Sequence, residues 1–198
     1  MSAGFFYSYH LGWTGTDAAT LLGDLESEGL RPEHPVTGRT LLVSLAPASS
    51  CGSRSPVTRD QLLSLAGLQR LREVGFRLWA DERLDLLVRI RRARAGVVVV
   101  EFGIGELPEP ERERAVSAIR RTVGRPSVLC IGFVVDRCGA TAATDWDGVV
   151  IEGTAYLDAW PDALAVRDET ASRHPQLGVT ESVERSPWRV FGSAVLGV

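Results

Sequence analysis

The chain has 198 residues, of which 44% are hydrophobic and 24% are charged. This length and composition allow a substantial core without disulfides or metals, so we expect one globular domain over 1–198, with 1–80 and 84–198 as alternative subdomains. The net charge of -3 gives no electrostatic reason to expect nucleic acid or an anionic membrane surface as a partner. All 22 residues of the Lys and Arg class are arginine, a bias typical of a bacterium with a GC-rich genome.

Targeting and redox signals are weak. No apolar run approaches the roughly 20 residues that a membrane-spanning helix needs, and residues 1–10 lack the sections of a signal peptide, which predicts a cytoplasmic protein without membrane contact. Cys51, Cys130 and Cys138 are scattered and form no C-x-x-C pair. Neither a disulfide framework nor a structural zinc site is therefore indicated.

The N-terminal residues predict a strand followed by a helix. Aromatic side chains alternate with other residues over 4–13, which is typical of a β-strand. Thr14 or Thr16 can then cap a helix whose apolar residues lie between 18 and 25 and which ends at Gly29.

A short strand, a loop and a second helix follow. The sequence predicts a strand over Thr40–Ala46 and then a loop over Pro47–Pro56, which is dense in serine, glycine and proline. Thr58 with Gln61 forms a capping box ahead of a leucine-rich run, and we expect that helix to continue to Gly75.

The stretch from Leu84 to Asp136 has the clearest pattern in the chain. Apolar and charged residues alternate over 84–91, with Arg89 and Arg91 on the polar side, so this segment predicts a half-buried strand. Residues 92–96 then form the basic tip of a hairpin, and a β-branched run over 97–102 supplies its second strand.

A helix and a buried strand complete this stretch. Acidic residues from Glu109 onward and arginines near Arg121 match the dipole of a helix that stops at Gly124. Residues 128–135 are apolar or small on both faces, which indicates a strand in the middle of a sheet covered on both sides. The helix is long enough to be a crossover that joins parallel strands.

The C-terminal third is less regular. We expect a strand over Val149–Glu152, a helix over Pro161–Arg173 and a final strand over Trp188–Leu196. Together the elements predict an α/β or α+β fold, a single layered domain with a mixed sheet of about six to eight strands and three to four helices.

Acidic residues after the buried strand are the best candidate site. Asp136, Asp145 and Asp147 follow the end of a predicted central strand, where open α/β sheets often bind ligands. Carboxylates of this kind can hold Mg²⁺ together with water and phosphate oxygens. The alternative is that they are solvated turn carboxylates, since closely spaced aspartates are common by chance.

Other catalytic signals are poorer. Cys51 would be a nucleophile if His10, His34 or His174 approached it in space, although serine-rich loops usually only connect elements. Gly52-Ser53 resembles the start of a nucleotidyltransferase site, but the acidic pair that should follow falls inside the leucine-rich helix. The P-loop, G-x-S-x-G and H-E-x-x-H motifs are absent from the sequence.

The basic run Arg89, Arg91, Arg92 and Arg94 has two interpretations. It could bind phosphates or an acidic partner, or it could be a solvated sheet face whose arginines pair with carboxylates of the same chain. No aromatic residue lies between Arg89 and Arg94, so a nucleic-acid surface is not favoured.

Two functional hypotheses follow. The first is a non-catalytic cytoplasmic binding or regulatory protein, in particular an immunity-type inhibitor that meets a basic partner protein with Asp145, Trp146, Asp147, Trp160 and Asp162. It requires no cofactor. The second is a small metal-assisted enzyme that uses Mg²⁺ at the three aspartates and acts on a phosphorylated or nucleotide substrate.

Overall fold

The computed structural model describes residues 4–43, 54–68, 72–125 and 129–192. The strands are β1 (Phe5–His10), β2 (Thr40–Val43), β3 (Arg54–Val57), β4 (Glu73–Trp79), β5 (Asp85–Arg92), β6 (Val98–Gly103), β7 (Cys130–Asp136), β8 (Ala163–Arg167), β9 (Val183–Arg185) and β10 (Trp188–Phe191). The helices are α1 (Gly15–Ser27), α2 (Arg59–Gly67), α3 (Glu109–Val123) and α4 (Asp168–Arg173), with the 3-10 helices η1 (Arg94–Gly96) and η3 (Leu177–Val179) and the π-helix η2 (Gly148–Glu152).

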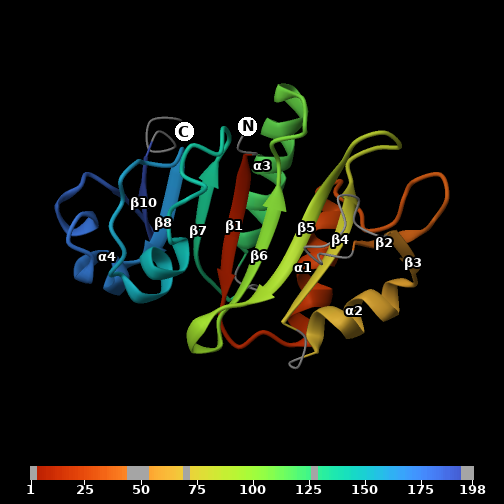
Figure 1. Ribbon diagram of the computed structural model, residues 1–198, viewed down its shortest axis with the longest axis horizontal. Coiled ribbons are helices and arrows are strands. Elements are labelled where there is room, and N and C mark those ends of the chain that lie inside the picture. The colour runs from red at the N-terminus through yellow and green to blue at the C-terminus, as the bar shows by residue number, and fades with distance from the viewer. Residues whose placement is uncertain (1–3, 44–53, 69–71, 126–128, 193–198) are drawn as a thin grey trace.

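All ten strands join one sheet in the order β3-β2-β4-β5-β6-β1-β7-β8-β10-β9 (Figure 1). Every pairing between these strands is antiparallel, which makes the fold α+β. The predictions of a mixed sheet and of six to eight strands are therefore wrong. The N-terminal strand β1 is the reason for the first error, because it lies between β6 and β7 and runs against both.

The predicted crossover helix is present, although it does not join adjacent strands. Helix α3 connects β6 to β7, and these strands point the same way because each is antiparallel to β1. Strands β6 and β7 are therefore not paired with each other, and β1 lies between them in the middle of the sheet. Only tertiary pairing, and not the pattern of residues 97–135, decides which strand occupies that position.

The sheet has two differently covered faces. On the helical face, apolar side chains of α1 and α3 pack on the strands in a core that contains Leu22, Phe102 and Ile119. The opposite face is covered over β1, β7 and β8 by the segment after Asp136, whose buried members include Val150. Figure 1 shows α1 and α3 behind the sheet, and the C-terminal third with α4, β8 and β10 at the left end of the view.

Helix α2 is shorter than predicted. Its capping box at Thr58 and Gln61 is confirmed, but the helix ends at Gly67 and not at Gly75. A Cβ atom on Gly67 would lie 2.6 Å from the Cα of Gly15, so this glycine allows α2 to meet the start of α1. The strand β4, which we did not predict, begins only six residues later at Glu73.

The start of β3 and the C-terminal third also differ from prediction. The loop over Pro47–Pro56 was expected to have no regular structure, yet its last residues belong to β3, while 44–53 lie outside the described residues. Residues 149–152 lie in the π-helix η2 and not in a strand.

The helix expected over Pro161–Arg173 is a strand followed by a short helix, β8 and α4. Residues Ala163–Val166 are fully buried, and pairing with β7 and β10 satisfies their backbone groups. Strand β10 is confirmed as far as Phe191, and the predicted continuation from 193 to 196 lies outside the described residues.

The other predicted elements are confirmed over the described residues, including the strand that begins at Thr40 as far as Val43. Thr14 caps α1, and β5 and β6 form the expected hairpin around η1. Helix α3 has its acidic first turn and basic last turn, and all residues of β7 are buried. No helix among the described residues is long and apolar enough to cross a membrane.

Candidate functional site

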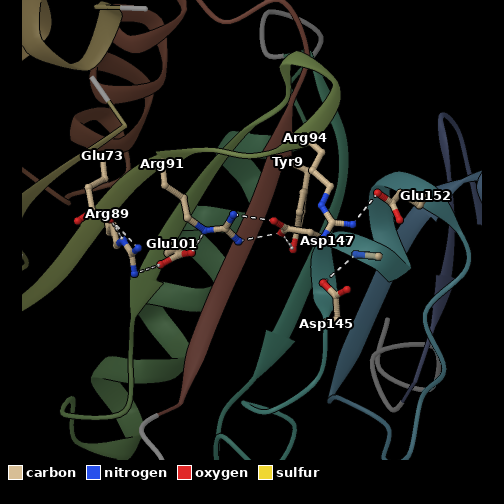
Figure 2. A network of polar contacts seen from close by, with 10 residues as sticks. Tyr9, Glu73, Arg89, Arg91, Arg94, Glu101, Asp145, Asp147 and Glu152 are labelled. Atoms are coloured by element: carbon tan, nitrogen blue, oxygen red, sulfur yellow. Dashed lines mark hydrogen bonds and ion pairs between the residues drawn. The ribbon is translucent and has the colours of Figure 1, made fainter. Parts of the chain in front are cut away.

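A row of charged side chains crosses the opposite face of the sheet. Cross-strand register places Arg89 of β5 beside Glu101 of β6, and Glu101 beside Tyr7 of β1. Arg89 also donates from Nε and Nη2 to Glu73 Oε2 of β4, at 3.0 and 2.6 Å. Figure 2 shows how the side chains from these strands approach one another.

Asp147 connects this row to the C-terminal third. The guanidinium of Arg91 donates to both carboxylate oxygens of Asp147, at 2.7 and 2.8 Å, and its Nε donates to Glu101 (Figure 2). The Tyr9 hydroxyl donates to the same aspartate at 3.3 Å. Burial lowers the pKa of Arg91, but the hydrogen bonds with Asp147 and Glu101 outweigh it and raise that pKa overall.

A shallow groove of about 260 Å³ lies beside this network. Phe5 and Tyr7 are stacked along one side with ring centroids 4.2 Å apart, and Leu87 and Gly103 line the other part. Burial, followed by the charge of Glu101, raises the pKa of Tyr7 to about 12, so its hydroxyl stays protonated. Arg89 and Glu101, which also line the groove, are already paired with each other and with Glu73 and Arg91 of the neighbouring strands.

The three aspartates of the metal hypothesis have separate local roles. Asp136 is buried and accepts hydrogen bonds from the backbone of Gly139 and from both the backbone and hydroxyl of Thr141. Asp145 is exposed and accepts from the backbone of Gly148. Within the described parts of the chain, no three His, Cys, Asp or Glu side chains form a group that could hold a metal ion.

The predicted partner-binding residues divide between core and surface. Trp146 is only 3% exposed, and its Nε1 donates to the carbonyl oxygen of Thr141. Asp162 accepts from the backbone N–H of Arg137 at 2.6 Å. Trp160, by contrast, is 43% exposed and lies 6.5 Å from Phe191 between ring centroids.

The loop that contains Trp160 presents a second aromatic residue and an acid. Tyr156 is 68% exposed, and Asp158 is exposed as well. Leu157, between them, is buried, and its N–H and C=O bond to the side-chain amide of Gln176 at 2.7 and 2.9 Å. The side chains of Tyr156, Asp158 and Trp160 are therefore exposed, while the backbone of Leu157 between them is held by hydrogen bonds.

A buried histidine fixes the same loop. His174 Nδ1 faces the backbone N–H groups of Gln176 and Leu177, so this nitrogen accepts hydrogen bonds. The other ring nitrogen, Nε2, is then the donor to the carbonyl oxygen of Ala155 at 2.7 Å. This arrangement gives His174 a structural role and reduces the conformational freedom that the loop would lose on binding a partner.

Sequence reasoning missed Tyr156 and Asp158. The sequence holds only a weak signal for their exposure. Residues 156–160 alternate polar or aromatic residues with small or apolar ones in a segment without regular structure. Nothing in that pattern distinguishes an exposed tyrosine from a buried one. The anchoring residue Gln176 lies 19 positions away, so only the fold reveals the arrangement.

The acidic surplus of the chain lies in the same region. Residues 138–192 contain nine Asp and Glu side chains but only four arginines, whereas residues 1–137 contain sixteen acids and eighteen arginines. The exposed loop thus belongs to the acidic part of the molecule, although the chain as a whole is close to neutral. Such segregation favours association with a basic surface.

Cys51 lies outside the described residues, so the approach of a histidine to its thiol stays a prediction. His10 is buried on the helical face, where its Nε2 lies 2.8 Å from the Ser8 hydroxyl, and burial lowers its pKa to about 3. The ring of His34 packs against that of Trp79, 4.4 Å away.

No family model matches the chain, and neither the curated proteins nor the solved structures include one significantly similar to it.

Proposed function

We propose that this chain is a non-catalytic binding protein whose partner is another protein with a basic surface. In its most specific form, the proposal is that binding blocks an enzymatic activity of the partner, as an immunity-type inhibitor does. The observation that carries the proposal is the anchored loop that exposes Tyr156, Asp158 and Trp160.

Three properties of the loop support a binding role. Tyrosine and tryptophan are the side chains most often responsible for affinity in protein interfaces, because they bury a large area with few rotatable bonds. The backbone behind Leu157 is already fixed, so little ordering remains to oppose binding. The acidic surplus of residues 138–192 would speed encounter with a basic partner.

The binding surface differs from the one expected from the sequence. Asp147 is engaged by Arg91 and Tyr9, and Trp146 is buried, so neither is presented to a partner. Trp160 remains in the proposed surface. Tyr156 and Asp158 take the places of Trp146 and Asp147 in it.

The test is a binding comparison with single substitutions in the loop. A partner captured by the wild-type protein is purified. Its affinity for Tyr156→Ala, Trp160→Ala and Asp158→Asn is measured by calorimetry, and its association rate by surface plasmon resonance. We expect each aromatic truncation to weaken binding by about tenfold or more, as buried interface aromatics do. Asp158→Asn should mainly lower the association rate, and the loss should shrink at high salt.

Two control substitutions lie away from the loop. Leu129 is 60% exposed, and Glu106 is an exposed acid before α3, so Leu129→Ala and Glu106→Gln change similar chemistry elsewhere. Both should bind like the wild type. Unchanged affinity in all three loop variants would refute the proposed surface, and a partner enzyme that keeps full activity in the complex would refute the inhibitory role.

A further inference from the structure

A second surface lies on the helical face of the sheet, at the end formed by β8, β10 and β9. The register places Arg167 of β8 directly beside Trp188 of β10, and Arg185 of β9 directly beside the same tryptophan on its other side. Residues opposite one another in neighbouring strands share a face. The three side chains therefore form a transverse row, Arg167–Trp188–Arg185, in which the two arginines stand about 10 Å apart across two strand spacings.

Both arginines of this row are exposed and unpaired. Within the described residues, neither Arg167 nor Arg185 makes a hydrogen bond or an ion pair with its side chain, whereas Arg89, Arg91 and Arg137 are each held by carboxylates. The nearby acid Asp168 does not form an ion pair with either arginine, because it pairs with Arg189, whose side chain lies on the other face of β10. Two positive charges thus flank the indole, and neither is paired with a carboxylate of the described residues, although Asp168 and Glu184 line a shallow pocket beside Trp188.

The tryptophan between them is held in a fixed orientation. Trp188 Nε1 donates to the carbonyl oxygen of Cys130 at 3.2 Å, and its ring meets that of Phe133 edge to face at 5.4 Å. The side chain is only half-buried, so part of the ring remains at the surface. Arg167 lies on this side too, because it alternates along β8 with Ala163 and Ala165, which belong to the core on the helical face.

We infer that the row Arg167–Trp188–Arg185 binds a ligand that carries an oxyanion, phosphate or carboxylate, beside a planar apolar group. Guanidinium groups recognise such anions with paired N–H donors, and the fixed indole offers a flat apolar surface between them. Charge complementarity selects this occupant over a cationic or purely apolar one. The inference is independent of the proposed function, because that surface uses other residues and carries the opposite charge.

Calorimetric titration of the full chain with phenyl phosphate and with benzoate tests the inference. We expect saturable binding of at least one probe, and weaker binding of inorganic phosphate, which lacks the ring. Arg167→Gln and Arg185→Gln should each weaken binding by about tenfold, the usual cost of losing a charge-assisted hydrogen bond. A tighter complex with one probe would identify phosphate or carboxylate as the preferred anion.

Arg173→Gln is the matched control. Arg173 is an exposed arginine of α4 outside the row, so its substitution changes the net charge equally and should leave the affinity within about twofold. Trp188→Phe, which retains an aromatic ring, should bind more weakly while its thermal unfolding shows that the fold persists. Absence of saturable binding by both probes, or an equal loss in Arg173→Gln, would overturn the inference.

Discussion

Asp147 is the residue through which the C-terminal third is held to the middle of the sheet. It begins η2, and it accepts hydrogen bonds from Arg91 of β5 and Tyr9 of β1. The carboxylate and the guanidinium are each about one-fifth exposed, so their attraction is screened less than that of a surface pair. The side chain of Asp147 thus contacts Tyr9, which lies 138 positions before it in the sequence, and Arg91, which lies 56 positions before it.

The first prediction compares this ion pair with a more exposed one. Asp147→Asn should lower the free energy of unfolding by about 1–3 kcal/mol, because Arg91 then keeps only Glu101 as a charged partner. Glu152→Gln removes the carboxylate that pairs with the exposed Arg94, and it should cost less than about 1 kcal/mol. Urea unfolding of both variants measures the difference, and equal losses would contradict the anchoring role.

At the same scale, the tryptophans show where sequence reasoning stops. Trp146 and Trp160 both neighbour aspartates or prolines in irregular segments, and both were predicted to face a partner. Trp146 is instead buried against the opposite face, while Trp160 is exposed. The difference arises because Trp146 directly precedes η2, which packs on the sheet, whereas Trp160 lies in the exposed loop that Gln176 and His174 hold. Local sequence encodes neither position.

At the scale of elements, the end of α2 depends on a contact between two helices. The leucine-rich run after Thr58 favours a helix well beyond Gly67, and that preference misled the prediction. The chain instead becomes extended, and residues Glu73–Trp79 pair with β5 and β2. Pairing on both sides of β4 outweighs the helical pattern of its sequence.

The second prediction concerns the glycine at this helix end. Gly67→Ala would place a Cβ atom against the backbone of Gly15, so we expect a loss of about 1–3 kcal/mol in unfolding free energy. Gly23→Ala is the matched control in α1, where the new methyl meets no atom within 4 Å beyond its own helix backbone and chain neighbours. This control should stabilise by roughly 0.4–1 kcal/mol. Thermal unfolding measures both variants. If both were stabilised or both destabilised, the close contact between Gly67 and Gly15 would not explain the effect of Gly67→Ala.

At the scale of the whole molecule, two cores share one sheet. Phe6 and Val100 belong to the core under α1 and α3, whereas Phe5 and Val99, which precede them in the sequence, belong to the core under the C-terminal third. Because alternate residues of β1 and β6 supply the two cores, neither core can be lost without exposing strands that the other needs. The two layers should therefore unfold together.

The third prediction is this cooperativity. Hydrogen exchange measured by mass spectrometry at increasing urea concentration should show α1 and η2 losing protection at the same midpoint. The expected result follows from the strands that both elements cover. Loss of protection in η2 at a clearly lower urea concentration would show that the C-terminal third unfolds separately.

The sequence by itself determined the features that depend on near neighbours. The caps at Thr14 and Thr58, the hairpin around η1, and the helix over 109–123 each rest on contacts between residues a few positions apart. Hydrophobic periodicity and backbone chemistry are sufficient to encode such elements.

Only the tertiary structure decided the rest. The position of β1 between β6 and β7 makes the sheet antiparallel, and the side chains of His174 and Gln176 turn the loop with Tyr156 and Trp160 outward. The row Arg167–Trp188–Arg185 likewise exists only because three separate strands align. These features join residues far apart in the chain, and the burial and pairing that create them arise when the whole sheet forms.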